Sequence, residues 1–198
     1  MAGSLEKRGL QQALAGGGVS RATALGFADE MRVGLRGMVR RVWGGRGVKV
    51  PQRLQLAYYW RYLFLVVNAQ AGKLHWCWLD SMAGAQMGAA VGGLQKHTEV
   101  ATVVWDGALG HWGEWVRALG MPLIGLPPYS PELNPAERVF QEVRRAIAGK
   151  VYTTLEDKMT AVAEFLRELE ADPERVRSLT WWDWIKAAVQ QLPFNYAA

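Results

Sequence analysis

Two apolar segments separated by a short turn constrain the fold more than any other part of this sequence. Tyr62 to Ala69 and Leu74 to Asp80 are rich in β-branched and aromatic residues, a composition typical of strands. The residues between them, Gln70 to Lys73, include a glycine and predict a hairpin turn. Because a hairpin must bury an apolar face against other elements, we expect a β-sheet at the centre of the fold.

Strands and helices alternate along the rest of the chain. Further strands are predicted at Leu25–Asp29, Glu99–Asp106 and Met121–Leu126, and helices at Ala83–Gln95, His111–Leu119 and from Pro135 onward. An antiparallel hairpin followed by alternating elements implies a mixed sheet covered by helices. The fold class is therefore predicted to be α/β, with a mixed five-stranded sheet flanked by helices.

The helix that begins at Pro135 has the clearest ends. Asn134 is a favourable N-cap, proline suits the first helical position, and Gly149 follows the last apolar residue of the helix. Thr154 is predicted to cap another amphipathic helix that runs to about Ala171. Helices are thus expected to dominate the last third of the chain.

Three segments are predicted to be less regular. Met1 to Ala24 is rich in Gly and Ala, so we expect a loose leader over residues 1–24 and one domain over residues 25–198. Arg32 to Gln52 is Gly-rich and basic, and is expected to be hairpin-like. Near the C-terminus, a tryptophan cluster either clasps the core or stacks on nucleic-acid bases. Its members are Trp181, Trp182 and Trp184.

Charge is distributed unevenly along the chain. The net charge is +5, and no Asp or Glu occurs from Met31 to Leu79. This span carries nine basic residues, among them Arg40, Arg41 and Arg46. A block of one sign suits a polyphosphate partner, and the planar guanidinium pairs well with phosphate oxygens. The alternative is an ordinary solvated basic face.

Composition also argues against several classes of protein. The longest purely aliphatic or aromatic stretch, Tyr62 to Val67, is too short to span a bilayer. Residues 1–18 lack the continuous apolar core of a signal peptide. Cys77 is the single cysteine, which excludes internal disulfides and a multi-cysteine zinc site. We therefore expect a cytosolic protein without membrane contact.

Three acidic residues occupy positions where ligands bind in α/β sheets. Asp29 and Asp106 each end a predicted strand, and Glu137 lies in the first turn of a helix. Carboxylates that cluster repel one another unless a cation lies between them. Oxygen ligands without a thiolate or a histidine pair favour Mg²⁺ or Mn²⁺. Two such ions roughly 3.5–4 Å apart can activate a water or hydroxyl and stabilise the leaving oxygen of a phosphodiester.

Each acid also has a simpler structural interpretation. Asp106 precedes a glycine and can start a turn. Asp29 is next to Glu30, and because side chains alternate along a strand, only one of the two can face a given site. Glu137 stands three residues after Asn134, which is the spacing of a capping box. For Glu137, spacing alone favours the capping role.

Three sequence blocks resemble the signature of mariner-related insertion-sequence transposases. They are Gly26 to Glu30, Val104 to Ala108 with His111, and Leu126 to Arg138, which reads LPPYSPELNPAER. The last block is long and specific, and the order matches, with 76 residues between Asp29 and Asp106 and 30 between Asp106 and Glu137. The resemblance covers about Gly26 to Val151. It implies a ribonuclease-H-like fold in which Asp29, Asp106 and Glu137 bind Mg²⁺.

The resemblance also bears on nucleic-acid contacts beside these acids. His111 matches a histidine of the family, and can contact DNA or simply pack at a helix N-terminus. Arg138, Arg144 and Arg145 lie on the helix of Glu137 and can follow a DNA backbone. The alternative is an ordinary solvated face, with Arg138 paired to Glu142 one turn away.

Two departures from the family pattern limit what is carried over. Gly107 stands where the family often has Asn, so a secondary polar contact is missing. Family members carry helix-turn-helix DNA-binding modules before the first aspartate, whereas only 28 residues precede Asp29 here. The chain resembles the second reading frame of a split transposase, which makes an upstream-frame helix-turn-helix protein an expected partner. A decayed fragment is the other interpretation.

These observations predict the catalytic domain of a DNA transposase, acting in the bacterial cytosol or nucleoid. The chain would cleave transposon ends and join them to target DNA with Mg²⁺ (or Mn²⁺), and we expect a homodimer on DNA. The alternative is a non-catalytic DNA-binding or dimerising remnant that regulates transposition. A third reading, a host nuclease on the same fold, is opposed by the long block that contains Glu137.

Overall fold

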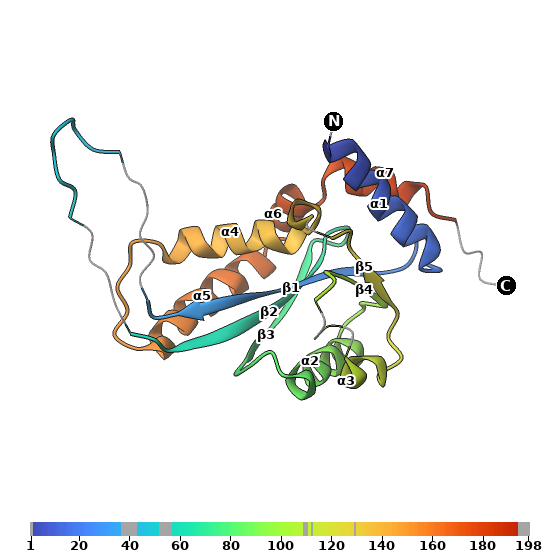
Figure 1. Cartoon of the computed structure of the whole chain (residues 1–198), viewed down its shortest axis with the longest axis horizontal. Coiled ribbons are helices and arrows are strands. Elements are labelled where there is room, and N and C mark those ends of the chain that lie inside the picture. Colours follow the sequence, from blue (N-terminus) through green and yellow to red (C-terminus); the bar gives the residue numbers. More distant parts are fainter. Residues whose placement is uncertain are drawn as a thin grey trace.

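A mixed five-stranded sheet is the centre of the fold, as predicted (Figure 1). The computed structural model describes residues 2–36, 43–51, 57–108, 111, 113–128 and 130–193, and the side chains from Gly9 onward within them. The strands lie in the order β3-β2-β1-β4-β5. They span β1 Leu25–Gly34, β2 Trp60–Asn68, β3 Lys73–Leu79, β4 Thr102–Trp105 and β5 Leu123–Gly125.

Strand direction divides the sheet into two parts. β1, β2 and β3 form an antiparallel meander, whereas β4 and β5 run parallel to β1. The predicted hairpin is β2–β3, and its turn contains Gly72 with φ of 67°, a left-handed conformation that favours glycine. A Cβ atom there would lie 2.2 Å from the carbonyl oxygen of Pro173, so the close approach of α6 also requires glycine.

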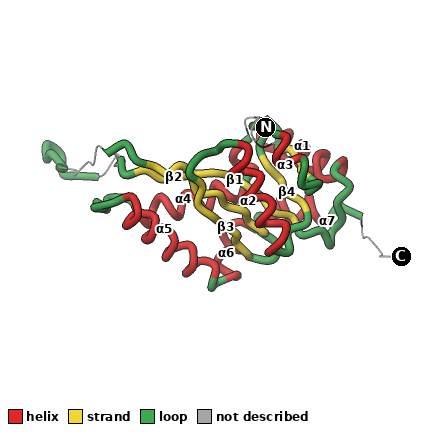
Figure 2. The backbone as a smooth tube through the Cα atoms, turned by 90° about the horizontal axis from the view of Figure 1, so that it is seen from below, coloured by secondary structure: helices red, strands yellow, loops and turns green. Residues whose placement is uncertain are grey.

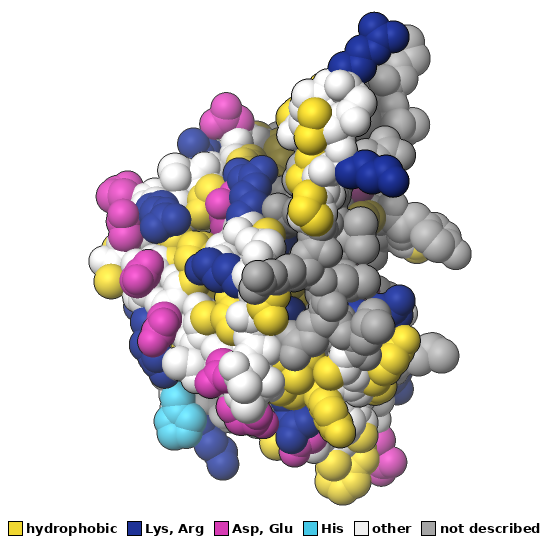
Figure 3. Space-filling view, turned by 90° about the vertical axis from the view of Figure 1, so that its left-hand side faces the viewer, with side chains coloured by type: hydrophobic (Ala, Val, Ile, Leu, Met, Phe, Trp, Pro, Cys, Tyr) yellow, Lys and Arg dark blue, Asp and Glu magenta, His cyan; other side chains and the backbone are white. Residues whose placement is uncertain are grey.

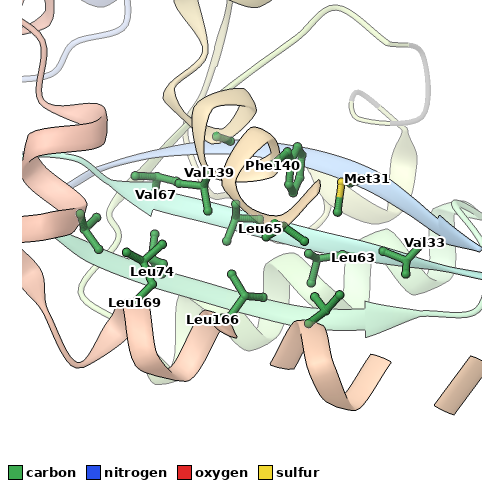
Figure 4. Close-up of a cluster of buried hydrophobic side chains, with 14 of the residues drawn as sticks. Met31, Val33, Leu63, Leu65, Val67, Leu74, Val139, Phe140, Leu166 and Leu169 are labelled. Atoms are coloured by element: carbon green, nitrogen blue, oxygen red, sulfur yellow. The ribbon is translucent and has the colours of Figure 1, made fainter. Parts of the chain in front are cut away.

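Three helices, α4 (Pro135–Ile147), α5 (Leu155–Glu170) and α6 (Pro173–Thr180), cover one face of the meander. Alternate residues of β1 and β2, including Met31 and Leu65, point at α4 and α5 (Figure 4). Phe140 of α4 and Leu166 of α5 are fully buried against them. The helix ends match the prediction, with Asn134 capping α4 and Thr154 forming a capping box with Asp157 at α5.

The opposite face is covered by α2 (Gly84–His97) and the short α3 (Glu114–Arg117). α2 lies over the strands on the side seen in Figure 2. Its buried residues Met87 and Val91 pack against Phe64 and Trp105 of the sheet in one core cluster. A helix was predicted over His111–Leu119, but α3 spans only Glu114–Arg117. His111 lies outside α3, and its side chain contacts the sheet instead.

The N-terminal segment does not form the loose leader that its glycines suggested. It contains α1 (Ala2–Gly16), which lies beside α7 (Asp183–Gln190) near β5 (Figure 1). Leu10 and Leu14, one helical turn apart, are fully buried in a cluster with Ile185 of α7 and Ile124 of β5. Two well-placed leucines thus outweigh the low helix propensity of the neighbouring glycines.

The tryptophan cluster near the C-terminus clasps the core. Trp181, Trp182 and Trp184 are partly buried against the cluster that joins α1, α7 and β5. The interpretation as a hydrophobic clasp is supported by this burial.

The basic segment Arg32–Gln52 was expected to be hairpin-like, and its residues 37–42 and 52 lie outside the described residues. Residues 43–51 lie away from the sheet with exposed side chains, and form a turn in which Val48 N–H donates to Gly45 O (Figure 1). No strand is present in this described stretch. Arg46 belongs to it and is exposed, whereas Arg40 and Arg41 lie outside the described residues. In the described part of the chain, no helix is long and apolar enough to cross a membrane.

Candidate active site

β1 continues past the point where its parallel partner stops. It pairs with β4 only over Leu25–Phe27, but with β2 as far as Gly34. We had predicted that the strand ends at Asp29. Asp29 instead lies inside β1, two residues beyond the last parallel pair. Within the described strands, the edge of β1 on the β4 side is open from this point, which exposes a site there.

Alternation along β1 separates the two adjacent acids. Met31 and Val33, which share the face of Asp29 by alternation, pack under α4 and α5. Ala28, which shares the face of Glu30, packs with α2 and α3. Asp29 therefore faces α4 and Glu30 faces the opposite side. The structure places Asp29, not Glu30, on the same side of the sheet as Glu137.

Asp29, Asp106 and Glu137 line one cleft of about 490 Å³. Asp106 directly follows β4, as predicted, and Glu137 lies in the first turn of α4. Gly107 and Ala108 after β4 form another part of the wall. The proline-rich block contributes Leu126–Pro128, Ser130–Pro131 and Asn134, around the short 3-10 helix η2 (Pro131–Leu133). The fold thus brings together three acids that lie far apart in the sequence.

Asn134 fixes the position of α4 relative to β1. Its Oδ1 accepts a hydrogen bond from Ala136 N–H at 3.1 Å, which caps the helix. Its Nδ2 donates to the carbonyl oxygen of Ala28 at 2.9 Å and to Asp29 Oδ2 at 3.4 Å. One buried side chain therefore caps the helix of Glu137 and holds the strand of Asp29.

The capping-box interpretation of Glu137 is wrong. The backbone N–H of Asn134, which a capping-box glutamate would accept, donates instead to the carbonyl oxygen of Pro131 at 2.9 Å. The Glu137 carboxylate, one-third exposed, accepts a hydrogen bond from Arg144 Nη1 at 3.3 Å. Because the 3-10 turn already provides an acceptor for the N–H of Asn134, the Glu137 carboxylate is not needed there and lines the cleft.

Asp29 carries an unfavourable charge in this setting. Burial, together with the nearby carboxylates of Glu137, Glu30 and Asp106, raises the pKa of Asp29 from 3.8 to about 7, although the hydrogen bond from Glu30 N–H acts in the opposite direction. Near neutral pH, ionisation of the Asp29 carboxyl therefore costs folding free energy. A cation in the cleft would remove that cost.

Asp106 is held by a buried pair on the far side of the sheet. His111 Nδ1 lies 2.6 Å from Asp106 Oδ1, an ion-pair distance without good hydrogen-bond geometry, and its Nε2 lies 3.0 Å from Glu30 Oε2. The side chains of His111 and Glu30 are 3% and 4% exposed, whereas that of Asp106 is 56% exposed. The imidazole stacks on Trp105, with centroids 4.0 Å apart and planes 12° apart.

These contacts favour a charged imidazole. Burial by itself lowers the pKa of His111, but the hydrogen bond and charge of Glu30, followed by the charge of Asp106, outweigh it and raise the pKa overall. The sequence had marked His111 as a DNA contact or a packing residue. The structure favours packing, and it shows Glu30 as a partner that we had considered only as a rival ligand to Asp29. Strand alternation next to Asp29 was the signal that could have identified this role.

The basic residues predicted on α4 have different surroundings. Arg138 pairs with Glu142 at 2.9 Å, the solvated alternative, and Arg145 also pairs with Glu142. Arg144 contacts the acid cleft directly through Glu137. Of the three, Arg144 is therefore the one that the fold places at the site.

The cleft has the chemistry of a divalent-cation site. All its charged donors are carboxylate oxygens, which suit Mg²⁺ or Mn²⁺. Among the described residues, no three His, Cys, Asp or Glu side chains come close enough to enclose an ion by themselves. Proteins often bind Mg²⁺ through one or two carboxylates completed by water and substrate phosphates. Asp29, Asp106 and Glu137 are thus candidate ligands whose site water and substrate phosphates would have to complete.

Fold and cleft together define a ribonuclease-H-like domain with an acidic site at the edge of β1. The sequence model of the DDE superfamily endonuclease family matches residues 24–158. The chain belongs to this family, as the resemblance of its three sequence blocks had indicated. A Sinorhizobium fredii protein, y4pE/y4sA, described as uncharacterized, is 27% identical over 132 residues, which are 63% of this chain and 96% of that protein.

Solved structures of the Mos1 mariner transposase share the fold. The Mos1 strand transfer complex matches 96% of this chain and 62% of its own, with a TM-score of 0.64 and 18% identity. The Mos1 paired-end complex with Mn gives a TM-score of 0.63 at 15% identity, over 96% and 61% of the two chains. The isolated Mos1 catalytic domain gives 0.57 at 16% identity, over 96% and 92%. This chain therefore spans about 62% of the Mos1 chain in the strand transfer complex.

Proposed function

We propose that this chain is the catalytic domain of a DNA transposase, which cleaves the ends of a mobile element and joins them to target DNA. The observation that carries the proposal is the cleft in which Asp29, Asp106 and Glu137 meet. Membership of the DDE superfamily endonucleases supports the cleavage of a phosphodiester. The Mos1 complexes with paired ends and with Mn support the choice of substrate and of a divalent cation.

The residues of the cleft have distinct roles in this proposal. Asp29, Asp106 and Glu137 hold Mg²⁺ or Mn²⁺, which when bound supplies an activated nucleophile and stabilises the leaving oxygen. Asn134 keeps the carboxylate of Asp29 beside the start of α4. His111 and Glu30 position Asp106 from behind the sheet and do not reach the cleft.

The partners follow from the same proposal. Transposon ends and target DNA are the substrates, and synapsis of two ends calls for a homodimer. Recognition of the terminal repeats falls to helix-turn-helix modules, supplied by an upstream reading frame or by a longer form of the protein. The fraction of the Mos1 chain that this chain matches leaves room for such modules.

The test compares the wild-type chain with Asp106→Asn on duplex DNA that carries the terminal repeats beside its gene. With Mg²⁺, we expect the substitution to reduce cleavage more than about 100-fold, beyond the effect of removing an outer partner of a metal site. Glu132→Gln is the matched control, since this exposed acid lies in the same proline-rich block without lining the cleft. Equal cleavage by wild type and Asp106→Asn would overturn the assignment.

A non-catalytic regulator is the second candidate. It is favoured by the separation of the acids, which do not enclose an ion by themselves among the described residues. Such a protein would bind DNA with the same affinity with and without Mg²⁺ or Mn²⁺. A metal titration of DNA binding therefore separates the two candidates, because the catalytic domain gains affinity when the cation neutralises its acids.

A further inference from the structure

A second, basic pocket lies along the open edge of β1. It has a volume of about 240 Å³ and lies beyond Asp29, where β1 approaches α4 and α5. Four basic residues line it: Arg32 and Arg36 from β1 and the bend after it, Arg144 from α4, and Lys158 from α5. Its other lining residues are Met31, Val33, Gly34 and Ile147, so none is acidic.

The charges of this basic pocket are incompletely neutralised. Lys158 is 8% exposed, and its Nζ donates to the carbonyl oxygen of Gly34. Within the described residues, Lys158 has no carboxylate within ion-pair distance. By strand alternation Arg32 lies on the face of Glu30, opposite Met31 and Val33, so it lines the pocket at the open edge of β1. Arg32 stands over the ring of Trp60 and Arg36 over that of Tyr58, each 5.4 Å from the centroid. A buried ammonium beside further cations is costly unless an anion joins it.

The basic pocket is coupled in space to the acid cleft. Arg144 lines the pocket while its Nη1 contacts Glu137 Oε2 at 3.3 Å. The pocket and the acid cleft therefore adjoin each other along α4. A DNA strand bound in the acid cleft would pass beside the basic pocket.

Exposed aromatic rings lie beside the arginines of this pocket. In Figure 3, Lys and Arg side chains appear at several places among hydrophobic and acidic side chains. Among the exposed large hydrophobic residues are Tyr58, Tyr59 and Trp60, which adjoin Arg32 and Arg36. Arginine beside exposed aromatic rings is a common setting for backbone phosphates and their bases.

We propose that the pocket formed by Arg32, Arg36, Arg144 and Lys158 binds a DNA backbone phosphate near the one cut in the acid cleft. This deepens the proposed function and rests on it. The guanidinium groups supply paired donors to phosphate oxygens, and Lys158 supplies a point charge at the base of the pocket. Two anchored phosphates would fix the register of the strand across the cleft, without reading its sequence.

The experiment measures the salt dependence of DNA binding by the full chain. All proteins carry Asp106→Asn and no Mg²⁺ is added, so that binding is recorded without cleavage. Fluorescence anisotropy with a random-sequence duplex between about 50 and 200 mM salt gives the slope of log K against log salt. Each lost phosphate contact lowers the slope by about 0.9.

The decisive variant is Arg32→Gln with Arg36→Gln, since both side chains are exposed and their loss leaves the core intact. We expect its slope to fall by about 1–2. The matched control is Arg167→Gln with Arg175→Gln, which removes the same charge from exposed positions of α5 and α6 outside the pocket. The control should keep the wild-type slope. The proposal would be overturned if the slope of the Arg32→Gln/Arg36→Gln variant equals that of the control, whether both keep the wild-type slope or both fall below it.

Lys158→Met gives a second measurement, because methionine preserves the apolar stem. Where its melting temperature shows a folded protein, its slope should also fall by about 0.9, and an unchanged slope contradicts the pocket. If it does not fold, the arginine pair decides alone.

Failure of this inference can be told from failure of the proposed function. Cleavage by the wild type in Mg²⁺, with no slope change in the arginine pair, rejects the phosphate pocket alone. A slope change without any cleavage rejects the catalytic role and supports the pocket.

Discussion

Asp29 and Glu30 are neighbours in the sequence, yet they meet opposite surroundings. Asp29 faces a cleft shared with two further acids, and burial raises its pKa to about 7. The Glu30 side chain is also enclosed, but it faces His111, and this contact raises the pKa of His111. Both carboxylates are taken out of water, and only Glu30 is paired with a protein cation there.

The difference shows how one strand can serve both stability and function. A buried acid with a cation partner supports the fold, and removing the partner leaves an uncompensated charge. A buried acid among other acids costs stability, and such sites persist where a ligand removes the cost. The face of Asp29 is therefore the one that we assign to a ligand, and the face of Glu30 the one that holds Asp106 in place.

The largest expected difference is in activity. Asp29→Asn should lower Mg²⁺-dependent DNA cleavage by more than about 100-fold, whereas Glu30→Gln should lower it by about 10–100-fold, as outer partners of metal sites do. Glutamine can still accept a hydrogen bond from His111. Because it carries no charge, it favours the positive charge of His111 less, and this charge is what orients Asp106. An NMR titration should show the pKa of His111 falling in Glu30→Gln. Equal activity losses in the two variants would remove the distinction between ligand and positioning residue.

Stability should separate the two acids in the opposite direction. Glu30→Leu removes the buried partner of His111 and leaves only the exposed carboxylate of Asp106, so it should lower the free energy of unfolding by up to about 3–5 kcal/mol. Adding His111→Phe should restore part of this loss, because a ring can still stack on Trp105 while the unpaired charge is gone. Denaturant unfolding of the two single variants and the double variant measures the coupling. Strictly additive losses would mean that the pair contributes nothing.

The smallest expected effect is a gain. Since folding raises the pKa of Asp29 from 3.8 to about 7, the folded state holds this proton more tightly than the unfolded state does. Its contribution to stability is therefore present below about pH 4 and lost as pH rises to about 7. Above that range, Asp29→Asn should stabilise the protein in EDTA by about 1–4 kcal/mol.

The measurement is the melting temperature of wild type and Asp29→Asn across this pH range. The two melting temperatures should agree below about pH 4, diverge as pH rises to about 7, and differ by a constant amount above that. Glu132→Gln, at an exposed position, should follow the wild type throughout. A constant difference between wild type and Asp29→Asn at every pH would argue against an unfavourable ionised Asp29.

Local signals in the sequence predicted much of the fold. The hairpin of β2 and β3 and the ends of α4 and α5 appear where their turn and cap residues indicated. These features depend on neighbours along the chain, so pattern and propensity suffice. α1 was missed because its stability comes from Leu10 and Leu14 packing on α7, a contact between opposite ends of the chain.

The site was predictable to a smaller extent. The long block ending at Glu137 and Arg138 marked the family, but its spacing equally allowed a capping box. Only the 3-10 turn at Pro131, which takes the N–H of Asn134, removes that alternative. Strand alternation placed Glu30 opposite Asp29, but its partner His111 comes from a separate element, and the basic pocket around Lys158 had no local signal because it joins side chains from three elements.

The sequence by itself determined a mixed sheet, the family of the chain, and three acids as candidate ligands. Those features follow from periodicity, turn chemistry and an ordered set of motifs. The tertiary structure decided which acid of the Asp29–Glu30 pair faces the cleft, because a strand alternates its side chains and only packing tells which face is which. It also decided what each acid meets there: other carboxylates for Asp29 and an imidazole for Glu30.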